Sequence, residues 1–245
     1  MTLPLQGKRA LVTGASGALG SAIARRLAAD GAQLLLHGNS RPEALQLLAE
    51  EISAAGGSAQ PCVFDLSDDQ ATAAAVAEML KGGAVQIIVN NAGVHDDAVF
   101  PGMKAEQWYR VIDVSLHGFF RVTQPLILPM LRTRWGRVIN VSSVTALAGN
   151  RGQVNYAAAK GALNSATKAL SLELASRGVT VNAIAPGIIA SPMADSAFDA
   201  EMVKRLVPAQ RAGTPDEVAQ LAGFLAGPGA AYITGQVISI NGGLY

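Results

Sequence analysis

The sequence predicts one doubly wound α/β domain over residues 1–245, with about seven parallel strands and helices on both faces of the sheet. Short apolar runs alternate along the chain with stretches whose apolar residues recur at helical spacing. The runs are apolar at consecutive positions, which is typical of parallel strands that are buried on both faces. No linker, charge block, low-complexity segment or short repeat divides the chain, so a single domain is expected.

The first half of the chain carries four expected strands, at residues 10–12, 34–36, 62–64 and 85–89. Gly31 is expected to cap the C-terminus of the first helix, and Ser40 the N-terminus of the second. Ser67 and Gln70 predict a capping box at the start of the third helix. Each strand is thus expected to lead into a helix that returns the chain for another parallel strand.

The second half repeats this scheme with longer helices. Helices are expected at residues 105–131, 154–175 and 215–225, and strands at 138–141, 179–184 and 237–240. Ligands in such sheets bind outside the carboxyl ends of the strands, near the point where the strand order reverses. The segments that directly follow the strands are therefore the candidates for a functional site.

Composition excludes several classes of protein. Half of the residues are hydrophobic and only 15% are charged, which excludes a disordered chain, and a net charge of +1 gives no support for nucleic-acid binding. A single cysteine, Cys62, excludes an internal disulfide framework and most thiolate zinc sites, and no metal is expected. Neither a signal peptide nor an apolar run of about 18 residues is visible, so we expect a cytoplasmic protein without membrane contact.

A glycine-rich loop joins the first strand to the first helix. Backbone amides at such a helix N-terminus suit a pyrophosphate, as in Rossmann-type dinucleotide sites. The loop residues expected to bind the cofactor are Gly14, Ser16, Gly17, Leu19 and Gly20. The alternative is a glycine-rich turn that only packs the strand against the helix.

The end of the second strand bears on the choice of dinucleotide. No acid stands there to bind a ribose 2′-hydroxyl, whereas Asn39, Ser40 and Arg41 offer hydrogen-bond donors and a cation. This favours a 2′-phosphate and hence NADPH. The alternative is that Ser40 caps its helix and Arg41 is solvated.

Three residues form a candidate catalytic set. Tyr156 and Lys160 are four residues apart on an expected helix and therefore share a face, and Ser143 follows the strand that ends at Val141. A nearby ammonium lowers the pKa of a phenol, and a serine hydroxyl can hold a carbonyl oxygen while the phenol delivers a proton. The alternative is an ordinary exposed tyrosine beside a solvated lysine.

These motifs together resemble the short-chain dehydrogenase/reductase family over essentially the whole chain. The likeness rests on the glycine loop, Asp65, Asn90-Asn91-Ala92-Gly93, Ser143, Tyr156, Lys160 and Pro186-Gly187. Residues 152–156, 181–187 and 232–243 look most like the 3-oxoacyl-[acyl-carrier-protein] reductases of that family.

The resemblance implies a role for each matching residue. Tyr156 is expected to be the general acid, Lys160 to lower its pKa and bind the nicotinamide ribose, and Ser143 to orient the carbonyl. Asp65 is expected at the adenine amino group, although it could also be only a strand-end residue near a helix cap. The other residues expected at the cofactor are Leu66, Asn91, Ala92, Gly93, Pro186, Gly187, Ile189 and Ser191, and Asn91 could instead only stabilise the sheet edge.

The sequence departs from the family pattern at three places. Ala18 stands where a glycine of the loop is usual, and Gly17 replaces a basic residue that is common in NADPH users. Ser115 stands where many members place an asparagine that holds a water of a proton relay, and we expect a relay of altered geometry. His95 and Asp96 could face the mouth of the substrate site or form a solvated loop.

The expected function is NADPH-dependent reduction of a 3-oxoacyl thioester on acyl carrier protein, with Tyr156 as proton donor. Residues 191–213 are expected to form a lid, and Arg134 and Arg177 to dock the acidic carrier protein, unless they serve only surface solubility. The resemblance also implies a homotetramer formed through the two long helices. The rivals are a reductase of a free alcohol or ketone, such as a sugar or steroid, and a non-catalytic dinucleotide sensor.

Overall fold

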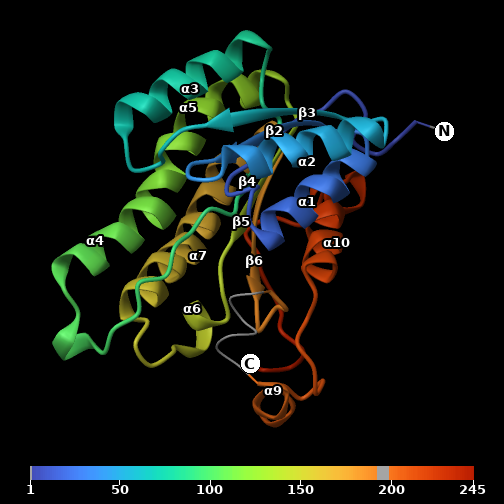
Figure 1. Ribbon diagram of the computed structural model, residues 1–245. Coiled ribbons are helices and arrows are strands. Elements are labelled where there is room, and N and C mark those ends of the chain that lie inside the picture. The colour runs from blue at the N-terminus through green and yellow to red at the C-terminus, as the bar shows by residue number, and fades with distance from the viewer. Residues whose placement is uncertain (1, 192–198) are drawn as a thin grey trace.

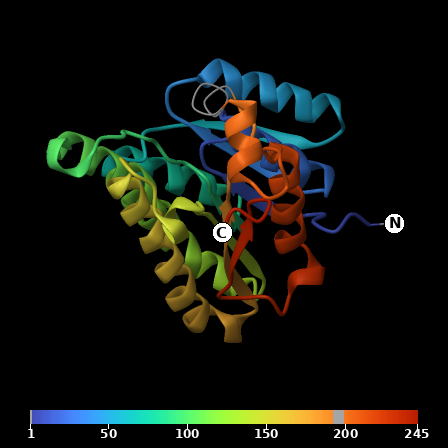
Figure 2. The ribbon, with the colours of Figure 1, turned by 90° about the horizontal axis from the view of Figure 1, so that it is seen from below.

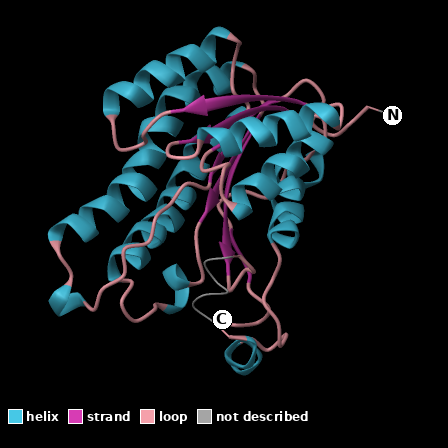
Figure 3. Cartoon of the chain, viewed as in Figure 1, coloured by secondary structure: helices cyan, strands magenta, loops and turns pink. Residues whose placement is uncertain are grey.

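The computed structural model describes residues 2–191 and 199–245. It contains a seven-stranded sheet in the order β3-β2-β1-β4-β5-β6-β7, and every pair of neighbouring strands is parallel. Helices cover both faces of this sheet (Figures 1 and 3). The predicted doubly wound α/β architecture is therefore confirmed, and the strand order reverses between β1 and β4.

The strands are buried because helices lie on both sides of them. The central strands β5 and β6 are buried at every position, including their few polar residues, as their largely apolar sequences predict. Their bounds are β1 (Arg9–Val12), β2 (Gln33–Gly38), β3 (Ser58–Val63), β4 (Ile87–Asn90), β5 (Gly136–Val141), β6 (Val179–Pro186) and β7 (Val237–Ile240).

The third strand differs from the prediction. It begins at Ser58, four residues before the predicted start, and ends at Val63. This strand lies at an edge of the sheet and pairs only with β2, so part of its surface faces solvent and its sequence is polar in the first half. An apolar run therefore marks only its last residues.

Two groups of helices enclose the sheet, and Figure 2 shows α7 and α10 on opposite sides of it. On one face lie α1 (Ala18–Ala29), α2 (Pro42–Ala54) and α10 (Pro215–Ala226). The other face carries α3 (Asp69–Lys81), α5 (Gly118–Arg132) and α7 (Val154–Leu174), with α4 (Ala105–Ile112) packed beside α7. Two short helices, α6 (Thr145–Ala148) and α9 (Ala200–Leu206), lie beyond the carboxyl ends of the central strands (Figure 1).

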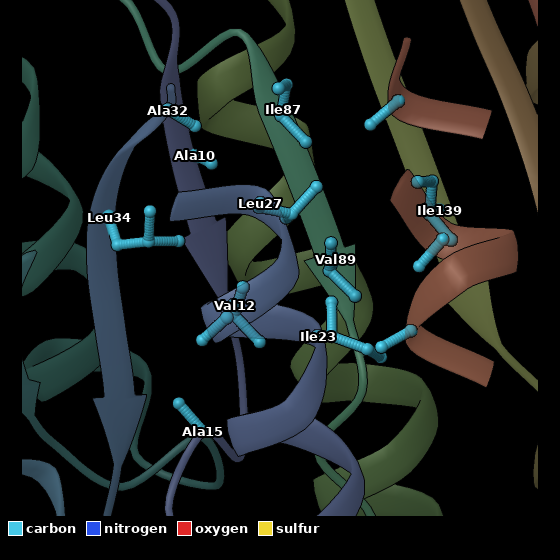
Figure 4. Close-up of a cluster of buried hydrophobic side chains, with 14 of the residues drawn as sticks. Ala10, Val12, Ala15, Ile23, Leu27, Ala32, Leu34, Ile87, Val89 and Ile139 are labelled. Carbon is cyan, nitrogen blue, oxygen red and sulfur yellow. The ribbon is translucent and has the colours of Figure 1, made fainter. Parts of the chain in front are cut away.

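The core on the α1 side is a continuous apolar cluster. Ile23 and Leu27 of α1 point onto Val12 and Val89 of the sheet (Figure 4), and all four side chains are fully buried. Burial of one such side chain contributes about 1.5–3 kcal/mol. This packing fixes α1, and with it the glycine loop that precedes α1, against the strand ends.

Two predicted helix caps are wrong. Asp68, not Ser67, caps α3, because its carboxylate accepts hydrogen bonds from the amides of Gln70 and Ala71. Helix α2 begins after Arg41 without a side-chain cap, so Ser40 does not have this role. Gly31, with φ of +99°, directly follows the end of α1, which agrees with its predicted role.

The first long helix is also interrupted. A π-helical turn, η2 (Asp113–His117), separates α4 from α5 where one helix over residues 105–131 is predicted. The apolar spacing continues through this turn, and therefore the sequence pattern does not reveal it. The turn buries Ser115 and directs this residue toward the sheet edge, and π turns occur frequently at functional sites.

A buried ladder of polar side chains joins the central strands to the helices behind them. Asn90 donates hydrogen bonds to Thr123 (3.0 Å) and Asn140 (2.9 Å), and Asn140 donates to Thr167 (2.8 Å). These bonds connect β4 and β5 with α5 and α7. They fix the rotation of α7, which carries Tyr156 and Lys160.

Candidate active site

The loops that follow β1, β4, β5 and β6 meet at the carboxyl edge of the sheet. The glycine loop is held there by the second strand, because the amide of Gly14 donates to Nδ1 of His37 (3.2 Å). Nε2 of His37 lies 3.1 Å from the carbonyl oxygen of Phe64, so the proton is assigned to Nε2. Burial lowers the pKa of His37 to about 4, and the ring is neutral at neutral pH.

Asn91 fastens the same loop from the other side. Its side-chain amide donates to the carbonyl oxygens of Thr13 (2.8 Å) and Gly14 (3.2 Å), and the Thr13 hydroxyl accepts from the amides of Asn91 and Ala92. The hydrogen bonds that the Asn91 side-chain amide donates therefore go to backbone carbonyl oxygens of the protein. This geometry favours the alternative in which Asn91 stabilises the sheet edge.

The amino end of α1 fits a pyrophosphate. Gly17 is the N-cap residue of α1 and has no side chain that could accept a hydrogen bond from the first-turn amides. A Cβ at this position would come no closer than 3.5 Å to the rest of the described chain. Packing within the protein thus does not require glycine at this position, and the first-turn amides of α1 are open to an anionic ligand. Gly20 is different, because a Cβ there would lie 2.9 Å from Cα of Ala15 and overlap the Gly14 carbonyl oxygen.

The residues predicted for the adenosine half gather beside this loop. Nη2 of Arg41 lies 3.5 Å from the hydroxyl of Ser16. Asp65 accepts from the amide and hydroxyl of Ser67 and from Asn39, and these hydrogen bonds lower the pKa of its carboxyl. The site therefore presents an exposed cation, amide and hydroxyl groups and one carboxylate, which fit a nucleotide with an additional phosphate.

The remaining predicted cofactor residues lie along the same edge, in different roles. Leu66 is buried in the core on the α3 side, so only its backbone could face a ligand. Pro186 ends β6, and Gly187 packs against Asn241, where a Cβ would lie 2.7 Å from that of Asn241. Ile189 forms a bridge with Gly213, and Ser191 is the last residue before the segment that is not described.

The predicted lid falls partly outside the described residues. Residues 192–198, with Pro192, Met193 and Phe198, are not described, and the rest of the segment contains α9. Val203 and Val207 of this part are buried. The lid therefore stays a prediction.

The three candidate catalytic residues meet at the carboxyl end of β5. Ser143 lies close enough to the Tyr156 phenol to lower its pKa, and Nζ of Lys160 lies 5.7 Å from the centre of the Tyr156 ring. Lys160 is almost completely buried, and its ammonium donates to the carbonyl oxygen of Val141 (2.7 Å). The spacing argument thus identified side chains that do converge.

The electrostatics of Tyr156 differ from the prediction. Burial raises the pKa of Tyr156 to about 12, and the Asp97 carboxylate adds to the rise while the hydrogen bond with Ser143 opposes it. Burial also lowers the pKa of Lys160 to about 8, so the ammonium is charged at neutral pH. The expected net lowering of the Tyr156 pKa by Lys160 is wrong here, because removal of the phenolate from water outweighs a cation at this distance.

Ser115 and Gly93 lie directly behind the lysine. A Cβ at Gly93 would lie 3.2 Å from Nζ of Lys160 and 3.4 Å from Oγ of Ser115. Oγ of Ser115 is buried and has no hydrogen-bond partner among the residues that the structure describes. A buried hydroxyl without a partner in the protein is suited to bind a water or a ligand group.

Sequence reasoning missed one histidine of the site and left the place of a second open. His37 lies under the glycine loop, and His95 stacks on Tyr156 with ring centroids 4.1 Å apart. The position of His37 at the end of a strand was a signal for the first. For His95, the sequence left a solvated loop as an equal alternative, and the structure places its ring on the phenol instead.

Arg134 and Arg177 are not brought to this site. They precede β5 and β6, whereas Ser143 follows β5, and a strand of this length separates the two ends by about 20 Å. The two arginines lie near each other, since a Cβ on Gly178 would touch the backbone of Arg134. They form an exposed basic pair at the amino edge of the sheet.

Comparison with known proteins identifies the family. A family model described as short chain dehydrogenase matches residues 8–202. The chain belongs to the short-chain dehydrogenases. As a member of this family it is an oxidoreductase that acts on a CH–OH or C=O group with a nicotinamide dinucleotide. Among the residues described, no helix is long and apolar enough to cross a membrane, and no cluster of three His, Cys, Asp or Glu could hold a metal.

Several known proteins align with this short-chain dehydrogenase over almost its whole length. A 3-oxoacyl-[acyl-carrier-protein] reductase FabG from Aggregatibacter actinomycetemcomitans is 42% identical over 236 residues, which are 96% of this chain and 98% of that protein. Nodulation protein G from Rhizobium sp. (strain N33) is 44% identical over 243 residues and 98% of each chain. A solved structure of a putative gluconate dehydrogenase from Agrobacterium tumefaciens superposes with a TM-score of 0.94 at 32% identity, over 100% of this chain and 98% of that one.

Proposed function

We propose that this short-chain dehydrogenase reduces a 3-oxoacyl thioester on acyl carrier protein to the 3-hydroxyacyl form with NADPH. The observation that carries the proposal is the placement of Ser143 and the phenol of Tyr156, both partly buried, beside the ammonium of Lys160. The choice of substrate is supported by several relatives named as reductases of this thioester at about 41% identity over nearly their whole length.

The cofactor assignment rests on the nucleotide end of the site. Arg41 and Ser16 form an exposed donor pair where a 2′-phosphate would lie, and Gly17 leaves the amino end of α1 open for the pyrophosphate. Lys160 would hold the nicotinamide ribose. When bound, NADPH supplies the hydride that adds to the carbonyl carbon.

The side chains of the chain itself supply the proton. The Ser143 hydroxyl holds the carbonyl oxygen, Tyr156 donates its phenol proton to that oxygen, and Lys160 stabilises the phenolate that remains. A phenol with a pKa of about 12 is still a far stronger acid than an alcohol, so it can protonate an alkoxide. The same high pKa disfavours the phenolate that the reverse reaction needs, and therefore the site favours reduction near neutral pH.

Tyr156→Phe tests the catalytic part. The variant should lose at least about a hundredfold in kcat and keep its affinity for NADPH, since general acid catalysis contributes about 10²–10⁴-fold. Stopped assays of NADPH consumption and fluorescence titration of NADPH measure the two quantities. A variant that retains its turnover contradicts the assignment and favours a dinucleotide-binding sensor.

Substrate class is tested by parallel assays. Carrier-bound acetoacetate should be reduced with a higher kcat/KM than a free ketone such as a keto-sugar acid. The free ketone is the relevant rival because the structurally similar protein is named a putative dehydrogenase of gluconate, a free sugar acid whose oxidation at a secondary hydroxyl gives a ketone. Faster reduction of the free ketone contradicts the thioester proposal and leaves the family assignment intact.

Carrier docking at Arg134 and Arg177 is tested by charge reversal of both residues. We expect KM for the carrier-bound substrate to rise about tenfold at low salt, because steering by charge acts on association. The same variant should reduce acetoacetyl-coenzyme A normally, since both arginines lie at the edge opposite Ser143. Unchanged KM for the carrier-bound substrate contradicts docking at this edge.

A homotetramer is the assembly that we propose. Phe120 of α5 and Leu172 of α7 are 63% and 84% exposed, which leaves large apolar side chains uncovered on both long helices. Light scattering of the purified protein measures its mass directly. A monomer at micromolar concentration contradicts the proposal.

A further inference from the structure

The imidazole of His95 covers one face of the Tyr156 phenol. The two ring centroids are 4.1 Å apart and the ring planes are inclined by 29°, which is a stacked arrangement. His95 lies on the loop that follows Gly93 at the end of β4, and Tyr156 lies in the first turn of α7. The contact therefore joins the loop that follows β4 to the start of helix α7.

Gln153 holds the imidazole in place. Its Nε2 lies 3.4 Å from Nδ1 of His95 and donates to Oδ2 of Asp97 (2.8 Å). The Gln153 carbonyl oxygen accepts from Thr145 (3.3 Å) and Asn150 (3.0 Å), which fixes the orientation of the amide. Since Gln153 directs an N–H group at Nδ1, that nitrogen is the acceptor and the neutral ring carries its proton on Nε2.

The loop itself is fastened to the start of α7. The amide of Ala98 donates to the carbonyl oxygen of Gly152 (2.9 Å), and Asn155, which is fully buried, donates to the carbonyl oxygen of Asp96 (2.9 Å). The path of the loop at His95 is thus set by the backbone contacts of Asp96 and Ala98, which follow it. It does not depend on the freedom of an exposed side chain.

Burial favours the neutral form of His95, because it is the largest effect on the pKa of this residue and lowers it. Among the described groups, Asp97 on its own loop raises this pKa and Lys160 on α7 lowers it. Tyr156 is the titratable group beneath it. The pKa of His95 therefore lies below the usual value of about 6.5.

We propose that His95 is a positioning residue for Tyr156, whose neutral imidazole stacks on the phenol and holds its hydroxyl beside Ser143. The inference rests on the proposed function in one respect, since it takes Tyr156 as the proton donor. A tyrosine that could swing about its first side-chain torsion would lose its alignment with the carbonyl oxygen, and a stacked ring prevents this motion.

Protonation of His95 disrupts the arrangement. An imidazolium cannot accept from Gln153, and its Nδ1–H group is drawn toward Oδ1 of Asp97, which lies 3.9 Å away. The ring then leaves its place over the phenol. Reduction should consequently decline in acid as His95 becomes charged.

Two substitutions separate the aromatic ring from the imidazole. His95→Ala removes the stack and should lower kcat about three- to tenfold with no change in the KM for NADPH. His95→Phe keeps the stack without a titrating group, so it should restore kcat at pH 8 to within about twofold and abolish the acid decline. His117→Phe is the matched control, because His117 pairs with Asp113 on an exposed turn and should leave the pH profile unchanged.

The assay distinguishes this inference from the proposed function. All variants are assayed with acetoacetyl-coenzyme A and with a free ketone, and the comparison uses whichever substrate the wild-type enzyme reduces. No reduction of the thioester by the wild type overturns the proposed function alone. A Phe variant as slow as the Ala variant, or one that keeps the acid decline, overturns the role of His95.

A second measurement needs no substrate. Proton nuclear magnetic resonance should show a His95 C2–H signal, identified by its absence in His95→Ala, that is shifted upfield by the Tyr156 ring and titrates below pH 6.5. Tyr156→Leu should remove the upfield shift. A signal at the position of an exposed histidine in the wild type overturns the stacked arrangement and with it the proposal.

Discussion

Nζ of Lys160 donates a 2.7 Å hydrogen bond to the carbonyl oxygen of Val141, and so an ammonium lies buried at the carboxyl end of β5. Burial lowers the pKa of this lysine to about 8, although the group remains charged at neutral pH. A charged group held in this way destabilises the folded state, because the free energy of its desolvation exceeds that of one hydrogen bond.

Lys160→Met should therefore stabilise the protein while it abolishes turnover. The lowered pKa of Lys160 corresponds to a destabilisation of the folded state by about 3 kcal/mol at pH 7. The substitution removes this destabilisation but also removes one hydrogen bond worth about 1 kcal/mol, so the expected net gain in stability is about 2 kcal/mol. Between pH 8 and the usual pKa of lysine, the unfolded chain binds more protons than the folded chain, so the stability of the wild type rises with pH. The stability advantage of Lys160→Met therefore shrinks below about 1 kcal/mol at pH 10. Urea unfolding at both pH values measures this; a loss of stability at pH 7 would falsify the account.

The same substitution at two glycines of the dinucleotide loop should lower mainly stability at one position and mainly NADPH affinity at the other. Gly20→Ala should lose about 2 kcal/mol or more of stability, because its Cβ would overlap the backbone of Gly14 and lie 2.9 Å from Cα of Ala15. Gly17→Ala should cost less than about 1 kcal/mol, since nothing described lies within 3.5 Å of its Cβ. Its NADPH affinity should nevertheless fall about tenfold, as measured by fluorescence titration; unchanged affinity contradicts a pyrophosphate at this helix end.

The buried His37 makes stability depend on pH. Its folded pKa of about 4 lies below the unfolded value, so its contribution is present above about pH 6.5 and is lost as pH falls through about 4. We expect a loss of up to about 3 kcal/mol over this interval. Thermal unfolding of wild type and His37→Gln at several pH values measures the difference, and parallel pH profiles of the two proteins would rule the histidine out.

Ser115→Ala should slow turnover several-fold and change the stability of the fold by less than about 1 kcal/mol. The buried hydroxyl makes no hydrogen bond to the described residues, so its removal breaks none within the protein. Turnover should fall because this hydroxyl, close to Gly93 and Lys160, would hold a water of the proton relay. Measurements of kcat between pH 6 and pH 10 test this, and a profile that matches wild type removes Ser115 from the mechanism.

Most of the fold could be predicted because its strands are buried on both faces. Mostly apolar runs marked β5 and β6, whereas the edge strand β3 was predicted too short because its solvent-facing half is polar. The π turn at residues 113–117 was missed since apolar spacing continues through it. The caps of α2 and α3 were assigned to neighbouring serines, because the sequence offers several polar residues at each start.

The candidate site was predictable to the extent that it follows from topology. Ser143 follows a strand and Tyr156 and Lys160 share a helix face, so a parallel sheet brings them together. The direction of the Tyr156 pKa was predicted wrongly because spacing reports a neighbouring charge and not the depth of burial. The stack of His95 on Tyr156 depends on the path of a loop, which no local pattern in the sequence encodes.

The reversal of strand order between β1 and β4 divides the enzyme's two tasks between separate parts of the chain. Arg41 and Asp65 follow β2 and β3 on one side, while Ser143 and Tyr156 follow β5 on the other. Lys160 would serve both tasks, since we propose that it holds the nicotinamide ribose and stabilises the Tyr156 phenolate. Substitutions in the turns that follow β2 and β3 could consequently change the coenzyme preference without changing the residues that transfer the proton.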